Sequence, residues 1–95
     1  MDQRDRERVR KLHAHLAATA ERPVETGASR WLGEAEAVVA DAVGENVPPE
    51  AVAKRVGQVR NLLANVEEIA DPEAGEHVAA ARDLAGELDE RLRPG

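Results

Sequence analysis

Apolar residues recur at steps of three and four along most of the chain, which is the spacing of an α-helix with one buried stripe. The repeats fall into four stretches separated by proline- and glycine-containing segments. In chain order the stripes are Val9, Leu12, Leu16 and Ala20; Trp31, Ala35, Val38 and Ala42, with Leu32, Val39 and Val43 beside them; Val52, Val56, Val59, Leu63, Val66 and Ala70; and Val78, Ala81, Ala85, Leu88 and Leu92. The pattern predicts four amphipathic helices.

Helix-breaking and helix-capping residues place the ends of the first two helices. Pro23 lacks an amide hydrogen and clashes with the preceding turn, so the first helix should stop near Arg22. Thr26 or Ser29 can cap the second helix through a hydroxyl oxygen. Gly44 can adopt the left-handed conformation that ends it.

Prolines open the other two helices. Pro48-Pro49-Glu50 suits a first helical turn, and Asp71-Pro72-Glu73 repeats this signature. The predicted helices therefore span residues 3–22, 29–43, 49–70 and 73–92. Residues 71–75 either reverse the chain tightly or only kink one long helix.

No stretch alternates β-branched and polar residues, so the fold class is all-α. Short connections favour antiparallel neighbours, which predicts an up-down four-helix bundle. We expect one domain over residues 1–95, with a charged N-terminal stretch, 1–8, that is open to fraying. Gly33, Gly57 and Gly86 lie inside predicted helices, where we interpret them as positions of close helix approach.

The core must be built from small side chains. Eleven Val, eight Leu and one each of Ile, Met and Trp stand beside 18 Ala in 95 residues. A chain this short hides only roughly 65% of its surface on folding, so we expect self-association, most simply a homodimer, or an unidentified protein partner. The second apolar face predicted for residues 29–43 supplies the candidate interface: Trp31, Leu32, Val39 and Val43. A non-enzymatic helical interaction module is the leading interpretation.

Charge makes nucleic acid a less favoured partner. Thirteen basic and 19 acidic residues give a net charge of −6, which repels phosphate on average. Residues 1–22 are the exception, with six basic and four acidic side chains. Nucleic-acid binding through this first helix is the alternative function, with candidate contacts Arg4, Arg6, Arg8 and Arg10.

The chain has no Cys, which excludes disulfides, thiolate metal sites and a cysteine nucleophile. Its N-terminal residues are charged, and no apolar run is long enough to span a membrane. We therefore predict a cytoplasmic protein without a membrane partner.

Histidines offer weak metal-site signals. His13 and His15 are two residues apart and so project about 200° from each other on a helix, which prevents joint chelation. In a bundle His13 could approach His77, with Glu73 or Glu76 as a further ligand. Surface or boundary positions are the simpler interpretation, and we assign no metal residue.

A metal-dependent nucleotide phosphohydrolase is a lesser alternative. Glu68 with Asp71 matches E-x-x-D, and Glu87 with Glu90 matches E-x-x-E, but the order is reversed from that of the small all-α enzymes of this class. The one Ser, Ser29, is better explained as a helix cap. We assign no catalytic residue, no cofactor-binding residue and no cofactor, and we expect no enzymatic activity.

Two segments carry a resemblance to known proteins. One runs from Lys54 to Arg82 and contains Val56-Gly57-Gln58-Val59-Arg60-Asn61-Leu62-Leu63; the other comprises His13–Glu21 with Trp31–Ala37. They resemble small uncharacterised acidic helical proteins of halophilic archaea, and the use of Arg over Lys, with 11 Arg and two Lys, fits that pattern. The resemblance implies a helical fold and a salt-rich cytoplasm, and it implies no activity.

Overall fold

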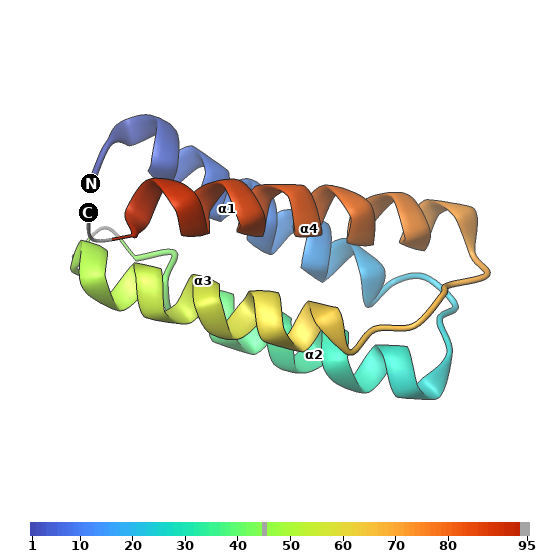
Figure 1. Cartoon of the computed structure of the whole chain (residues 1–95). Coiled ribbons are helices and arrows are strands. Elements are labelled where there is room, and N and C mark those ends of the chain that lie inside the picture. The colour runs from blue at the N-terminus through green and yellow to red at the C-terminus, as the bar shows by residue number, and fades with distance from the viewer. Residues whose placement is uncertain (45, 94–95) are drawn as a thin grey trace.

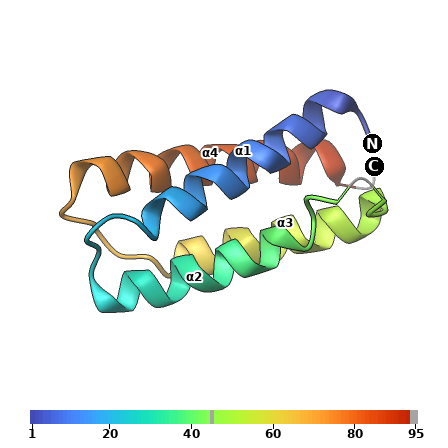
Figure 2. The ribbon, with the colours of Figure 1, turned by 180° about the vertical axis from the view of Figure 1, so that it is seen from behind.

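The computed structural model describes residues 1–44 and 46–93, which form four helices: α1 (Gln3–Thr19), α2 (Thr26–Ala40), α3 (Pro49–Ala64) and α4 (Pro72–Leu92). Each helix packs against the next along the chain, and α4 returns to pack against α1. Helices α1 and α4 lie over α2 and α3, and the start of α1 and the end of α4 lie at the same end of the bundle (Figures 1 and 2). The predicted all-α, up-down four-helix bundle is confirmed.

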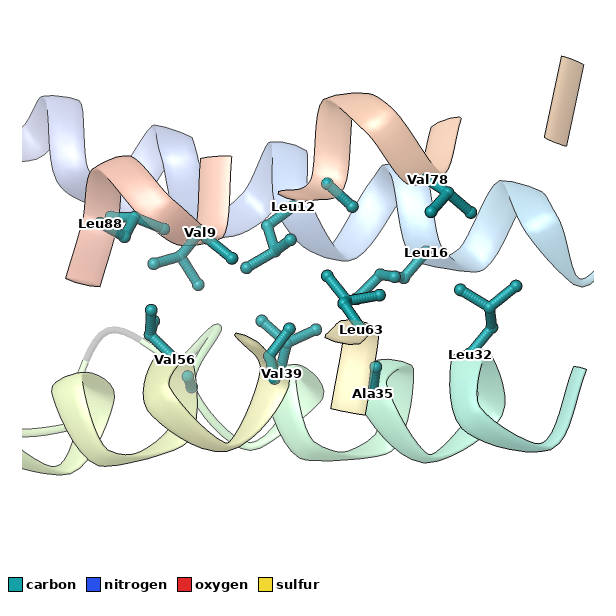
Figure 3. Packing of buried hydrophobic residues seen from close by; sticks show 14 of the residues in the cluster. Val9, Leu12, Leu16, Leu32, Ala35, Val39, Val56, Leu63, Val78 and Leu88 are labelled. Carbon is teal, nitrogen blue, oxygen red and sulfur yellow. The ribbon is translucent and has the colours of Figure 1, made fainter. Parts of the chain in front are cut away.

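The core is a continuous cluster of Val, Leu and Ala side chains contributed by all four helices. Figure 3 shows Leu32, Ala35 and Val39 of α2 pointing toward the layer formed by α1 and α4. The stripes predicted for the first, third and fourth helices are buried, except that Ala20 and Ala70 are exposed and Leu92 is half-buried. None of the helices in the described ranges combines the length and the apolar character needed to cross a bilayer.

The stripe predicted for the second helix is partly wrong. Leu32 and Val39, which we placed beside the stripe, have exposed fractions of 2% and 0% and form the centre of the buried face. Trp31 and Val38, which we placed on the stripe, are half-buried at its edge. Both pairs have the same seven-residue spacing, so periodicity alone could not decide which pair faces the core.

Helix α3 ends at Ala64, six residues earlier than predicted. The guanidinium of Arg82 in α4 donates hydrogen bonds to the carbonyl oxygens of Leu63 (3.0 Å) and Val66 (2.8 Å). The Leu63 carbonyl also accepts from the Val66 amide (3.1 Å), so Arg82 joins α4 to the turn that follows α3. The chain then reverses over residues 65–71, so the ambiguity at residues 71–75 is resolved as a reversal that precedes α4 rather than a kink.

The ends of α1 and α2 also differ from the prediction. Helix α1 ends at Thr19, whose buried hydroxyl donates to the carbonyl oxygen of Leu16 (2.6 Å). Helix α2 starts after Glu25 without a side-chain cap, so neither Thr26 nor Ser29 has the capping role we predicted. It ends at Ala40, and Gly44 does not adopt a positive φ.

The glycine interpretation is wrong. A β-carbon built at Gly33, Gly57 or Gly86 would have no neighbour within 4 Å beyond its own helix. Close helix approach therefore does not require glycine at these positions.

Candidate interaction surface

A shallow groove runs along the outer side of the contact between α2 and α3. It has a volume of about 520 Å³. Its apolar floor comprises Ala37, Val38 and Leu62, and its polar rim comprises Glu34, Arg55, Gln58, Asn61 and Asn65. Val38 and Leu62 pack against the core from its edge and are half-buried.

A second hollow of about 250 Å³ extends this groove toward the start of α2. Asn65 borders both hollows, so the two are neighbours on the same side of the bundle. Trp31 lines the second hollow together with three acidic residues, Glu25, Glu67 and Glu68. We refer to the two hollows together as the α2–α3 groove.

The α2–α3 groove is electrically asymmetric. Arg55 lies ten residues before Asn65, which corresponds to roughly 15 Å of helix, and its guanidinium donates to the Gln58 side chain (3.2 Å). At the far end lie the acidic residues that surround Trp31. In the described ranges no salt bridge joins Glu25, Glu67 or Glu68 to a cation of the chain. The first hollow thus contains one cation, Arg55, with one carboxylate, Glu34, whereas the second contains three carboxylates and no cation.

The structure separates the four interface residues predicted from the sequence. Leu32 and Val39 are buried in the core of the single chain, so they have no surface to offer and their assignment to an interface is corrected. Trp31 lies in the α2–α3 groove, whereas Val43 is half-buried and lines neither hollow. No large apolar side chain in the described part of the chain is strongly exposed.

The sequence reasoning missed Leu62 and Arg55 as groove residues and assigned Val38 to the core. Leu62 precedes Leu63, the buried member of the α3 stripe, as Val38 precedes Val39. On both helices the apolar residue one position before a core residue lies at the edge of the buried face. Adjacent apolar pairs are therefore the signal that could have located the groove.

Arg8, one of the four predicted nucleic-acid contacts, is half-buried at the contact between α1 and α4. Its guanidinium pairs with Asp5 (2.7 Å) and with Glu87 of α4 (2.8 Å). Asp5 has an exposed fraction of only 5% and also accepts from Arg91 of α4 (2.6 Å). The ion pairs of Arg8 therefore link α1 to α4, and they leave this guanidinium poorly placed to bind a phosphate.

The other three arginines are more available. Arg4 and Arg10 are exposed, Arg6 is half-buried, and no salt bridge is found for them within the described residues. Nucleic-acid binding stays a prediction that rests on these three. If the prediction holds, replacing these arginines with Ala abolishes the retention of DNA or RNA by the protein.

The histidine that reaches His77 is His15, not His13. The Nδ1 atoms of His15 and His77 are 2.9 Å apart, and both side chains are half-buried. Glu73 instead pairs with Arg22 (3.2 Å). In the described ranges no group of three or more His, Asp or Glu side chains is arranged to hold a metal ion.

The acidic pairs of the phosphohydrolase alternative do not converge. Asp71 caps α4 by accepting from the Ala74 amide (3.0 Å), and it accepts two hydrogen bonds from Arg22 (3.0 and 3.1 Å). The bond from Arg22, and then that from Ala74, hold the pKa of Asp71 below its ordinary value. The hydrogen bond to Asp71 raises the pKa of Arg22. Glu87, in turn, is paired with Arg8.

Comparison with known proteins supports one family assignment. A family model described as Domain of unknown function (DUF8152) matches residues 8–94. A search of the curated proteins and a search of the solved structures find no match to the chain. The family match does not link the chain to halophilic archaea.

Proposed function

This chain belongs to the DUF8152 family, and we propose that it is a self-associating helical interaction module whose contact surface is the α2–α3 groove. The observation that carries the proposal is the charge asymmetry along a groove with an apolar floor. A second copy is the occupant that matches both features. The same groove on two molecules provides apolar floor against apolar floor, as an isologous dimer requires.

Two-fold pairing brings unlike ends of the groove together. When two copies pack with their α3 helices antiparallel, Arg55 of one copy lies against the partner's Trp31, Glu67 and Glu68. The arrangement occurs twice by symmetry, which gives two contacts between a guanidinium and an acidic, aromatic site. Arginine is well suited to both carboxylates and indole faces. The amide side chains of Gln58, Asn61 and Asn65 supply hydrogen-bonding groups between these ends.

The large apolar side chains of the groove, Trp31, Val38 and Leu62, are half-buried, which predicts a modest interface between the two copies. Because no large apolar residue of the described ranges is strongly exposed, the folded single chain needs no partner to cover its core. We therefore propose a reversible dimer rather than an obligate one. The absence of Cys and the acidic composition support a place in a salt-rich cytoplasm as part of the same proposal.

Light scattering coupled to size-exclusion chromatography tests this function over a range of protein concentrations. We expect Val38→Asn and Leu62→Asn to shift the wild-type dimer to monomer, with far-ultraviolet circular dichroism verifying the helical fold. Val43→Asn is the matched control, because Val43 is equally half-buried and lies outside the groove. A wild-type chain that stays monomeric at millimolar concentration, or a dimer lost only in the Val43 variant, would contradict the proposal.

A further inference from the structure

The pairing of His15 and His77 joins the helices that lie farthest from the α2–α3 groove. The two rings come from α1 and α4, their Nδ1 atoms are 2.9 Å apart and their centroids are 5.2 Å apart, with ring planes inclined at 46°. A bond between two Nδ1 atoms requires that one ring carry its proton on Nδ1 and the other on Nε2. An N–H of one imidazole therefore faces the lone pair of the other between two helices, and both Nδ1 atoms become metal ligands once that proton has moved to Nε2.

We propose that His15 and His77 form a binding site for one late first-row transition-metal dication of the Zn²⁺ type. Imidazole nitrogen is a preferred ligand of these ions. Two imidazoles on one tetrahedral ion, with Zn–N distances of 2.0–2.1 Å, have their nitrogens about 3.3 Å apart and their ring centroids about 5.2 Å apart. The centroid separation in this structure already equals the second value.

Metal entry therefore needs a tilt of the rings and no translation of the helices. The nitrogens have to separate by roughly 0.4 Å from their present 2.9 Å, and each ring has to turn so that its Nδ1 lone pair points at the ion. Both side chains are half-buried, so each ring keeps one side in contact with solvent. The ring that carries its proton on Nδ1 transfers it through solvent to its own Nε2, so neither imidazole changes its charge.

The remaining coordination positions belong to water. Glu73, a potential further ligand, is paired with Arg22, and no third His, Asp or Glu of the described ranges joins the two histidines in a metal-binding group. The site is thus a two-point link between the first and last helices. Binding to the folded state alone stabilises the chain by mass action.

Calorimetric titration of the full chain with ZnCl₂, after removal of metals with EDTA, tests the site. We expect one ion per chain and a rise in Tm of roughly 5 °C or more at ten times Kd. Both effects should be lost in His15→Gln and His77→Gln. The matched control is His13→Gln, which removes a half-buried histidine of the same helix that is not paired with His77. This variant should bind Zn²⁺ as the wild type does.

Nitrogen-15 spectra of the imidazole rings provide a readout that does not depend on the variants folding. Added Zn²⁺ should shift the Nδ1 signals of His15 and His77, place both ring protons on Nε2 and leave His13 unchanged. Equal Zn²⁺ binding by wild type and His15→Gln, or unchanged His15 and His77 signals at saturating Zn²⁺, would overturn the proposal. Self-association through the groove is measured separately, so either proposal can fail alone.

Discussion

The carboxylate of Asp5, near the start of α1, accepts a 2.6 Å hydrogen bond from Nε of Arg91, which lies 86 residues later near the end of α4. The bond joins the start of α1 to the end of α4. These two helix ends lie at the same end of the bundle (Figure 1). Asp5 also pairs with Arg8, so one buried carboxylate contacts two guanidinium groups, and Glu87 supplies a second negative charge to Arg8. Buried carboxylates require such partners, since desolvation penalises an unpaired charge.

Removing this carboxylate should destabilise the fold. We expect Asp5→Ala to lower the free energy of unfolding by about 2 kcal/mol, because two charge-assisted hydrogen bonds are lost near the core. Asp83→Ala, at an exposed position of α4 with no salt bridge in the described ranges, should change it by less than about 0.5 kcal/mol. Urea unfolding followed by circular dichroism measures both, and equal losses would refute the role of Asp5.

The Arg22–Asp71 contact should make stability depend on acid. The pKa of Asp71 is lowered in the folded chain, whereas an unfolded Asp has a pKa of about 3.9. The carboxylate therefore contributes stability above about pH 4, and this contribution is lost as the pH falls through the lower folded pKa.

Asp71→Asn isolates this charge, because its amide oxygen can still accept from Ala74 and cap α4. We expect the variant to be less stable than wild type at pH 6, and the difference to shrink as the pH falls through the lowered folded pKa of Asp71. Arg22→Gln removes the same contact from the other side, so the double variant should be little worse than either single variant. A constant difference between wild type and Asp71→Asn across this pH range would show that charge is not the cause.

The helical glycines provide a test of packing. Because a β-carbon at Gly33, Gly57 or Gly86 meets no neighbour within 4 Å, each Gly→Ala change should raise the free energy of unfolding by up to ~1 kcal/mol. The physical reason is the smaller loss of backbone entropy on folding. Thermal melts measure the gain, and a loss of stability at any of the three positions would reveal a contact that the single chain lacks.

Salt should strengthen self-association. Two chains of net charge −6 repel each other over long range, whereas the attraction between Arg55 and the acidic end of the groove acts at contact. Salt screens the long-range repulsion between the two chains first, because the Debye length falls from about 10 Å at 0.1 M to about 3 Å at 1 M salt. We expect the dimer fraction at fixed protein concentration to be higher in 2 M than in 0.1 M KCl. Sedimentation velocity measures the dimer fraction. A lower dimer fraction in 2 M KCl would mean that the attraction between Arg55 and the acidic end of the groove outweighs the repulsion between the chains.

Periodicity was sufficient to predict the number of helices, their order and most of the core, because few large apolar residues compete for the buried positions. It failed on α2, where Trp31 with Val38 and Leu32 with Val39 have identical spacing. Only the neighbouring helices determine which pair is enclosed. On α2 the groove therefore includes Trp31 of the predicted interface, but it has Val38 in place of the buried Val39.

Long-range side-chain contacts were also beyond the sequence pattern. At the end of α3, the Leu63 carbonyl oxygen accepts from Arg82, which lies 19 residues later on another helix. The pairing of His77 with His15 rather than His13 depends on the rotation of α1 about its axis, which the apolar stripe fixes only approximately. Such contacts follow from packing and leave no local signature.

A charge exchange across the groove tests the central claim most directly. Arg55→Glu alone and the double variant Glu67→Lys with Glu68→Lys alone each place like charges at both ends of the two-fold contact, so we expect each to be monomeric. Mixed in equal amounts they restore unlike pairs at both ends, and light scattering should then detect a 1:1 heterodimer. A mixture that remains monomeric under conditions in which the wild type is dimeric would contradict the α2–α3 groove as the self-association surface.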